Sequence, residues 1–200
     1  MNRDVRGQNV DKTYKSMDFS VFKRLSNRWQ LLASYSATKI HFPIMNTGAG
    51  TVTGQNVLGG DRNPNAEINT TDNTWEWTGK LSGVYQFPAQ VLVSAQFEHA
   101  SGRSFAREVL FRGGRTIPSI AVNVEPFGTR RLPNVNQLDL RLEKDFRLRV
   151  GHKVGVRMNI FNALNTNTVL SLVRRSGPTF LLPQDIMPPR IAEFSVSYTF

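Results

Sequence analysis

The sequence predicts an all-β fold in which about seven long strands form an antiparallel meander. Apolar and polar residues alternate with a period of two in seven segments, as expected for strands with one apolar and one polar face. The connections between these segments are alternately short and long. No apolar run reaches the roughly 18 residues of a transmembrane helix, so a helical membrane protein is excluded.

The first four strands show the alternation at different strengths. In the second, one face carries Trp29, Leu31, Ala33, Tyr35 and Ala37, and the other carries Gln30, Ser34, Ser36 and Thr38. The fourth alternates less regularly because Leu92 falls on its polar face. We expect these strands at residues 14–25, 29–39, 75–87 and 91–99.

The last three strands extend the pattern to the final residue. In the fifth, leucines alternate with charged residues, and a helical period would bury Asp139 and Arg141 beside those leucines. A strand is therefore expected instead of a helix. The three segments are residues 137–146, 154–162 and 192–200.

The connections indicate how the strands are arranged in space. Three are short, with the sequences SNR, PAQ and RLRVGHK. The other three, roughly residues 40–74, 100–134 and 164–189, are longer than is usual in a compact soluble domain. Short turns on one rim and long loops on the other are typical of an outer-membrane β-barrel, so we expect a curved partial barrel of this type.

The aromatic residues of the apolar face fall near the two ends of the expected strands, as in the aromatic girdles of membrane barrels. Lys23, Lys39 and Lys144 fall on the apolar face although they are charged. They lie near strand ends, where a long side chain can reach water. The girdle at the short-turn rim comprises Trp29, Tyr85, Phe87, Phe146, Tyr198 and Phe200, and the opposite girdle comprises Trp75 and Trp77. The charges expected to face a watery lumen are Asp139, Arg141, Glu143 and Arg157.

Several segments carry a resemblance to a known family. LPNVNQLDLRLEKDFRL, VGVRMNIFNALNTNTVLS and MPPRIAEFSVSYTF resemble the C-terminal part of TonB-dependent outer-membrane receptors of the Oar-like branch, and the likeness covers nearly the whole chain. The most specific elements are the terminal aromatic and the motif NIFNALN. The signature residues of that motif are Asn159, Phe161, Asn162, Leu164 and Asn165.

The resemblance implies an energy-coupled receptor that transports a substrate across the bacterial outer membrane. It implies that the last strand closes a barrel of about 22 strands and that the barrel-assembly machinery reads an aromatic C-terminal signal. In this sequence the matching residues are Phe194, Val196, Tyr198 and Phe200. The implied partners are outer-membrane lipid, lipopolysaccharide, the remaining barrel and plug, and TonB through a part N-terminal to this chain.

The sequence also departs from the family. An odd strand count does not suit a closed antiparallel barrel, and we find no plug, energy-coupling motif or signal peptide. Residues 1–200 are therefore expected to form the C-terminal fragment of a receptor barrel. The longest loops, residues 43–72, 104–133 and 165–188, are expected to face outside, where their arginines attract anions or are simply solvated.

Catalytic, cofactor and metal sites are not expected. The chain has no cysteine, and His41, His99 and His152 lie in or beside different strands without a metal-ligand spacing. A hydrolase would need a partner for a histidine, such as His99 with Ser101 or Ser104, and such neighbours are common by chance.

Three alternatives remain open at the level of sequence. A soluble antiparallel sandwich also alternates, but it does not explain long loops on one rim only. A stand-alone structural or adhesive barrel would have to close within this chain. The net charge of +10 is compatible with a soluble nucleic-acid-binding sheet, although the arginines cluster in loops and turns; we expect no nucleic-acid partner.

Overall fold

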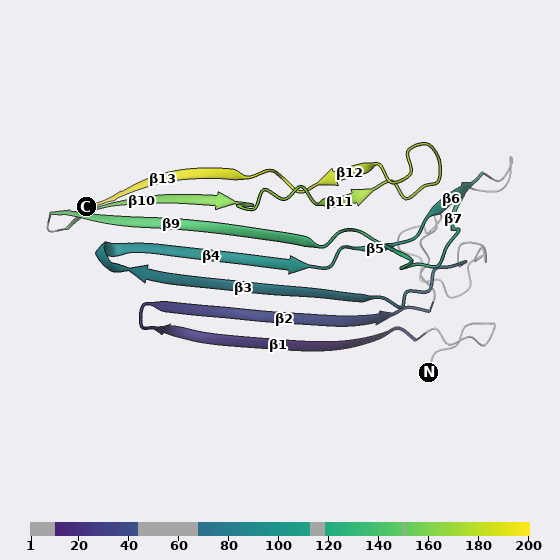
Figure 1. The fold of residues 1–200 in the computed structure, drawn as a ribbon, viewed down its shortest axis with the longest axis horizontal. Helices are drawn as coiled ribbons and strands as arrows, with labels where there is room; N and C mark the ends of the chain where they lie inside the picture. Colours follow the sequence, from purple (N-terminus) through teal and green to yellow (C-terminus); the bar gives the residue numbers. More distant parts are fainter. Residues whose placement is uncertain (1–10, 44–67, 113–118, 150) are drawn as a thin grey trace.

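The computed structural model describes residues 11–43, 68–112, 119–149 and 151–200. Its main element is one seven-stranded antiparallel sheet in the order β1-β2-β3-β4-β9-β10-β13 (Figure 1). These strands are β1 (Thr13–Ser26), β2 (Trp29–His41), β3 (Trp75–Phe87), β4 (Val91–Ala100), β9 (Val135–Arg149), β10 (His152–Phe161) and β13 (Ile191–Thr199).

The meander of seven strands is confirmed. Each strand pairs with the next strand of the large sheet along the chain, and every pairing is antiparallel. The sheet is not closed, so β1 and β13 are its two edges. The fifth strand is longer than expected because its pairing continues beyond the alternating core, from Val135 opposite Ala100 to Arg149 opposite His152.

The three short turns lie at one end of the sheet, together with the C-terminus (Figure 1). Between β1 and β2, Asn27 and Arg28 both adopt positive φ, as a two-residue turn of type I′ requires. Between β3 and β4, Pro88–Gln90 forms a single 3₁₀ turn in which Ala89 has a φ of 59°. The short-turn rim follows directly from these local conformations.

The described parts of the long connections lie at the other end, and two of the connections contain secondary structure that the sequence did not predict (Figure 1). Three two-stranded ladders form there, with strands of only two to four residues. Strands this short give no measurable period of two. The pairs are β5 (Ser104–Phe105) with β8 (Arg130–Arg131), β6 (Glu108–Phe111) with β7 (Ile120–Asn123), and β11 (Val169–Leu172) with β12 (Pro183–Ile186).

Burial is concentrated among these connections and not in the large sheet. Among the described residues, no large apolar side chain of the seven strands is buried. The sheet is a single layer, whereas an ordinary soluble domain packs two or more layers around one core. The buried apolar residues are Phe105, Ala106, Ile120, Leu132 and Met187.

Candidate functional site

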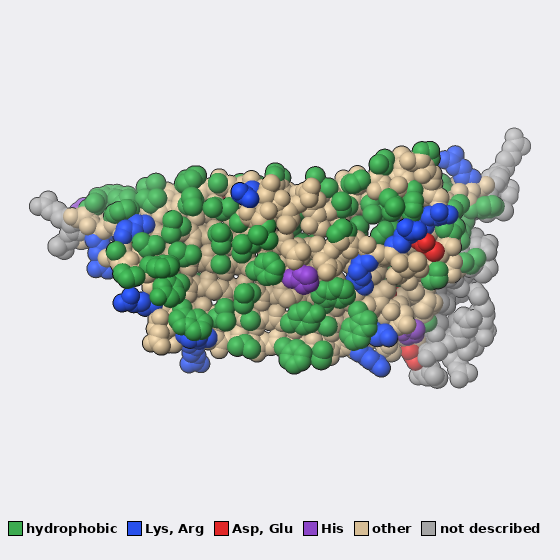
Figure 2. Space-filling model, viewed as in Figure 1, with side chains coloured by type: hydrophobic (Ala, Val, Ile, Leu, Met, Phe, Trp, Pro, Cys, Tyr) green, Lys and Arg blue, Asp and Glu red, His purple; other side chains and the backbone are tan. Residues whose placement is uncertain are grey.

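The first candidate site is the apolar face of the sheet. The register aligns apolar side chains from strand to strand, so that one row crosses six of the seven strands. Figure 2 shows hydrophobic side chains over much of the sheet and most Lys and Arg side chains toward its two ends. The row consists of Trp29, Tyr85, Val93, Leu142, Met158 and Phe194.

This face is uncovered. Leu81, in the middle of β3, is 44% exposed, and Val21 on β1 is 62% exposed. Apolar patches of this extent on a protein surface mark a site that contacts membrane or another protein. The apolar face therefore requires a cover that the described chain does not supply.

The aromatic residues bound the apolar face at both ends. Trp29 pairs with Tyr85, and eight residue steps further along β2, Ala37 pairs with Trp77. Eight steps correspond to about 27 Å along a strand. With the tilt of 35–45° usual for membrane strands, this gives a band about 20 Å tall, close to the roughly 25 Å of outer-membrane barrels.

The other predicted girdle residues occupy the ends that the sequence indicated. Phe87 pairs with Val91 beside the short turn, and Phe146 and Tyr198 flank Val154 in one row. Trp75, like Trp77, lies at the long-loop end of β3. These are positions on the sheet, and their roles in a membrane belong to the proposal below.

Among the lysines on the apolar face, Lys23 and Lys144 reach the short-turn rim. The Lys23 ammonium lies 3.7 Å from the ring centroid of Trp29 and donates to the carbonyl oxygen of Ser26 at 3.0 Å. Lys144 lies over Phe146 and donates to the carbonyl oxygen of Ala89. Both side chains thus direct their charge away from the middle of the apolar face.

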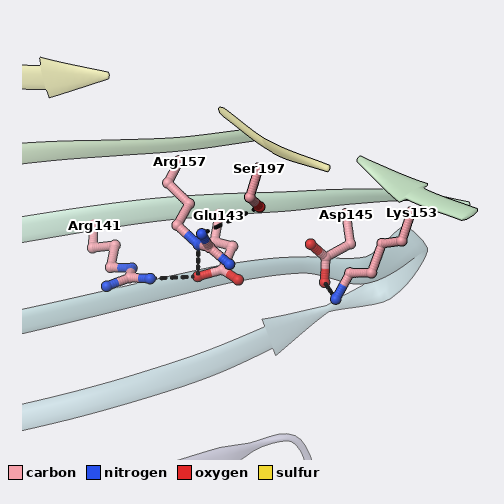
Figure 3. Close-up of polar contacts among 6 residues, drawn as sticks. All are labelled: Arg141, Glu143, Asp145, Lys153, Arg157 and Ser197. Carbon is pink, nitrogen blue, oxygen red and sulfur yellow. Dashed lines mark hydrogen bonds and ion pairs between the residues drawn. The ribbon is translucent and has the colours of Figure 1, made fainter. Parts of the chain in front are cut away.

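The polar face carries a network of ion pairs between β9 and β10, which a hydrogen bond extends to β13 (Figure 3). Glu143 accepts from Arg141 at 2.8 Å and pairs with the Nε atom of Arg157 at 3.2 Å. Arg157 also donates to the hydroxyl of Ser197 at 3.3 Å, and Asp145 pairs with Lys153 at 2.7 Å. Three of the four charges expected to share a face therefore contact one another.

Asp139, the fourth, lies on the same face but has a different role. One of its carboxylate oxygens accepts the backbone N–H of Asn162 at 2.9 Å, and both accept from the side chain of Gln137. Asp139 therefore fixes the end of β10 and takes no part in the ion-pair network.

Gly155 makes room for this network. A Cβ atom at Gly155 would lie 2.8 Å from the Ser197 hydroxyl and 3.0 Å from one carboxylate oxygen of Asp145. Real Cβ atoms do not approach a heavy atom as closely as 2.8 Å. A side chain at this position would therefore displace the ends of the Ser197 and Asp145 side chains.

β10 ends within the NIFNALN motif, and two asparagines of this motif hydrogen-bond to the connection that leads to β13. Asn162 is 4% exposed and has a φ of 48°. Its amide donates to the carbonyl oxygens of Thr166 and Pro188, and its side-chain oxygen accepts the N–H of Thr166. Asn165, with a φ of 53°, accepts the backbone N–H of Arg190 at 3.0 Å.

The other three signature residues do not join this hydrogen-bonded centre. Asn159 lies on the polar face between Arg141 and Glu193. Phe161 and Leu164 are exposed. The structure therefore gives the two positive-φ asparagines a clear structural function, which the sequence pattern alone did not reveal.

The residues of the predicted assembly signal lie on the edge strand β13 and directly after it. Phe194 and Val196 are 71% and 72% exposed and share the apolar face with Tyr198. Phe200 follows the strand and lies 6.0 Å from the Tyr198 ring. Tyr198 also stacks on His152, whose Nδ1 atom is 2.7 Å from the tyrosine hydroxyl.

The second candidate site is the loop cluster, defined here as the described parts of the three long connections. Two of them meet at Phe180, whose ring lies below the guanidinium groups of Arg107 and Arg130 at 5.7 and 5.3 Å. The third joins through Asn69 and Asn123, which each donate a side-chain amide to the other's carbonyl oxygen. The cluster is therefore a folded unit.

Glu125 supports this cluster through its carboxylate. It accepts from the side chain of Arg130 at 2.6 Å and from the backbone N–H of Arg107 at 2.8 Å. The hydrogen bond from Arg130 lowers the pKa of Glu125, against a smaller opposing effect of burial. The carboxylate is therefore held in its charged form.

The histidines do not form a catalytic pair. Nε2 of His99 is 3.3 Å from the indole nitrogen of Trp77, and Nδ1 is 2.7 Å from the amide oxygen of Asn136. Because the indole nitrogen only donates, both ring nitrogens of His99 are already engaged. Ser101 accepts from the backbone of Trp77, so the suggested His99 pairing with a serine is not found.

Across the described residues, no group of three or more His, Asp or Glu side chains is placed to hold a metal ion. Within residues 11–43, 68–112, 119–149 and 151–200, no helix is long and apolar enough to cross a membrane. Comparison with protein-family models, curated proteins and solved structures found no match to this chain.

Proposed function

We propose that this chain forms part of the β-barrel of a TonB-dependent receptor in the bacterial outer membrane, and that the receptor carries an unidentified substrate across that membrane. The observation that carries the proposal is the uncovered apolar face, bounded at both ends by aromatic side chains. The proposal gives the chain a binding and transport role, with no catalytic step and no cofactor.

Lipid is the cover that fits this face best. A second protein layer would need a matching apolar surface, whereas a bilayer covers any face whose apolar band matches its thickness. The backbone groups within the sheet are paired across strands, as a membrane requires. The charged network of the opposite face then borders a watery interior.

The open sheet favours the proposal that this chain is part of a larger barrel over the alternative of a small barrel that closes within the chain. Neither β1 nor β13 closes the sheet by pairing with the other, and unpaired strand edges are not tolerated in lipid. Further strands of the receptor would pair with both edges. In the proposed barrel, Phe194, Val196, Tyr198 and Phe200 face lipid and present the signal read by the barrel-assembly machinery.

The loop cluster would lie on the outer surface, and the short turns on the periplasmic side. This orientation follows the general arrangement of bacterial barrels, in which long loops face outside. The plug and the contact with TonB would belong to other parts of the receptor.

Cell fractionation tests the proposal. An antibody against residues 188–200 should detect the protein in the outer-membrane fraction of source cells, and alkaline carbonate should not extract it. Protease added to intact cells should cleave within the loop cluster. Recovery in the soluble fraction would overturn the proposal, and salt-sensitive binding to DNA by that soluble protein would favour the nucleic-acid alternative.

A further inference from the structure

We propose that the loop cluster binds a small ligand with a carboxylate or phosphate group, in a groove between the connection after β4 and the connection after β10. The inference deepens the proposed function, on which it rests, because an outward-facing loop cluster is where a receptor first meets its ligand. It names the chemical class of that ligand.

The two walls of the groove are fixed to each other. Glu108 and Arg175 form a bridge between the two connections, in which the N–H of Glu108 donates to the carbonyl oxygen of Arg174 at 3.0 Å. The N–H of Ser176 donates to the carbonyl oxygen of Glu108 at 2.7 Å. The groove therefore exists before a ligand binds, which reduces the entropy lost on binding.

The groove consists of two adjoining hollows with volumes of about 340 and 420 Å³. Leu172, Arg174 and Gln184 line both hollows. These volumes fall within the range of small-molecule sites in proteins. A small ligand is therefore a better match than a large apolar surface.

The charge of the lining selects an anion. Arg103 and Arg174 line one hollow, and Arg174 and Arg175 line the other, together with the carboxylate of Glu108. Glu108 pairs with Arg174 at 3.2 Å. Among the described residues, neither Arg103 nor Arg175 has an ion-pair partner, so two guanidinium groups keep all their donors for a ligand.

Two buried hydroxyls point to the same ligand chemistry. Within the described part of the chain, the hydroxyl oxygens of Ser104 and Ser176 are buried and have no hydrogen-bond partner. Each serine lines one of the hollows. A buried hydroxyl without a partner is unfavourable, and a carboxylate or phosphate oxygen is the acceptor that would satisfy it beside an arginine.

Arginine footprinting tests the inference on the whole protein in outer-membrane vesicles. Phenylglyoxal modifies guanidinium groups, and mass spectrometry reports the rate at each site. Citrate and inorganic phosphate are the probes, with sodium chloride at equal ionic strength as the control. Arg147, exposed on the polar face near the short turns, is the internal reference.

Saturating citrate or phosphate should slow modification of Arg103 and Arg175 by about threefold to tenfold, as expected when a ligand occupies these donors, and should leave Arg147 unchanged. Protection by citrate alone would assign a carboxylate ligand, and protection by phosphate alone a phosphate ligand. No protection, or equal slowing at all three arginines, would overturn the inference.

The Ser104→Ala variant separates a ligand contact from general electrostatics. The variant removes a hydroxyl that has no partner, so we expect no loss of stability, but half-maximal protection should need about threefold more probe. Ser94→Ala, on the polar face of β4, is the matched control and should not change the titration. Equal titrations for both variants would contradict a contact at Ser104.

The fractionation experiment distinguishes a failure of the receptor proposal from a failure of the ligand inference. If the protein lies in the outer membrane and shows no site-specific protection, the ligand inference fails and the receptor proposal stands. If the protein is soluble, the receptor proposal fails, and footprinting of that soluble protein still decides whether the groove binds anions.

Discussion

Asn162 illustrates how a single side chain can determine the path of the backbone. It combines a left-handed conformation with hydrogen bonds to residues on both sides of the connection after β10. Asparagine tolerates this conformation better than most residues, because its short polar side chain bonds the backbone locally. The motif is therefore explained by backbone geometry.

We predict that Asn162→Ala lowers the free energy of unfolding by about 2–4 kcal/mol, through lost hydrogen bonds and left-handed strain. Asn162→Gly should lose about 1 kcal/mol less, since glycine accepts a positive φ. Urea unfolding of the protein in lipid vesicles measures both. Leu164→Ala, at an exposed neighbour, should change stability by less than about 1 kcal/mol, and a larger effect there would contradict the special role of Asn162.

Gly155 provides a second prediction at the scale of one residue. Gly155→Ala should destabilise the protein by about 1 kcal/mol, because the new methyl group displaces the Ser197 hydroxyl and crowds Asp145, although both groups are side-chain ends that can shift. Adding Ser197→Ala should restore part of the loss. Gly83→Ala is the control, since its Cβ would lie 3.6 Å from the nearest atoms, and the same unfolding measurement should show a change within about 0.5 kcal/mol.

At the scale of elements, the loop cluster is held together by contacts between residues far apart in the chain. Phe180 lies against two arginines from another connection, and the two asparagines Asn69 and Asn123 join a third. The charged carboxylate of Glu125 belongs to the same cluster, because it accepts hydrogen bonds from the Arg107 backbone and the Arg130 side chain.

The cluster should therefore loosen in acid. Because the pKa of Glu125 is lowered on folding, its contribution is fully present above the ordinary glutamate pKa of about 4.3 and is lost as the pH falls through the lowered value. Hydrogen exchange of the Arg107 amide, corrected for its intrinsic rate, should show less protection below about pH 4. The Leu132 amide, bonded to Arg103, is the internal reference. Glu125→Gln should abolish the pH dependence at Arg107, and an unchanged profile would show that another group is responsible.

At the scale of the whole molecule, one face of the sheet is apolar and the other is polar. The proposed position in the membrane depends on this difference in polarity. Leu81 lies in the middle of the apolar face, and its chain neighbour Ser82 points to the polar face. The two positions therefore share one strand and one depth and differ in the face they occupy.

We predict that Leu81→Arg destabilises the protein in lipid vesicles by about 2–4 kcal/mol, the range for an arginine on the lipid face near the bilayer midplane. Ser82→Arg should cost less than about 1 kcal/mol because a watery interior accepts the charge. Denaturant titration in vesicles measures both variants. Similar values for the two would mean that lipid does not cover the apolar face.

The sequence by itself determined the seven long strands, their order as a meander and the polarity of each face. It could do so because strand periodicity and turn conformation depend on neighbours a few residues apart. The positions of Trp29, Trp77 and Tyr85 at the ends of the apolar face follow from the same local pattern.

Only the tertiary structure decided how the long connections fold, which charges pair and what the asparagine motif does. The contacts of Phe180 with Arg107 and of Asn69 with Asn123 join residues dozens of positions apart, in segments without a period. Such contacts depend on the register of the whole sheet, which brings the connections to one rim. The groove proposed to bind an anion lies between two of these connections. Arg103 from one connection and Arg174 from the other line the same hollow.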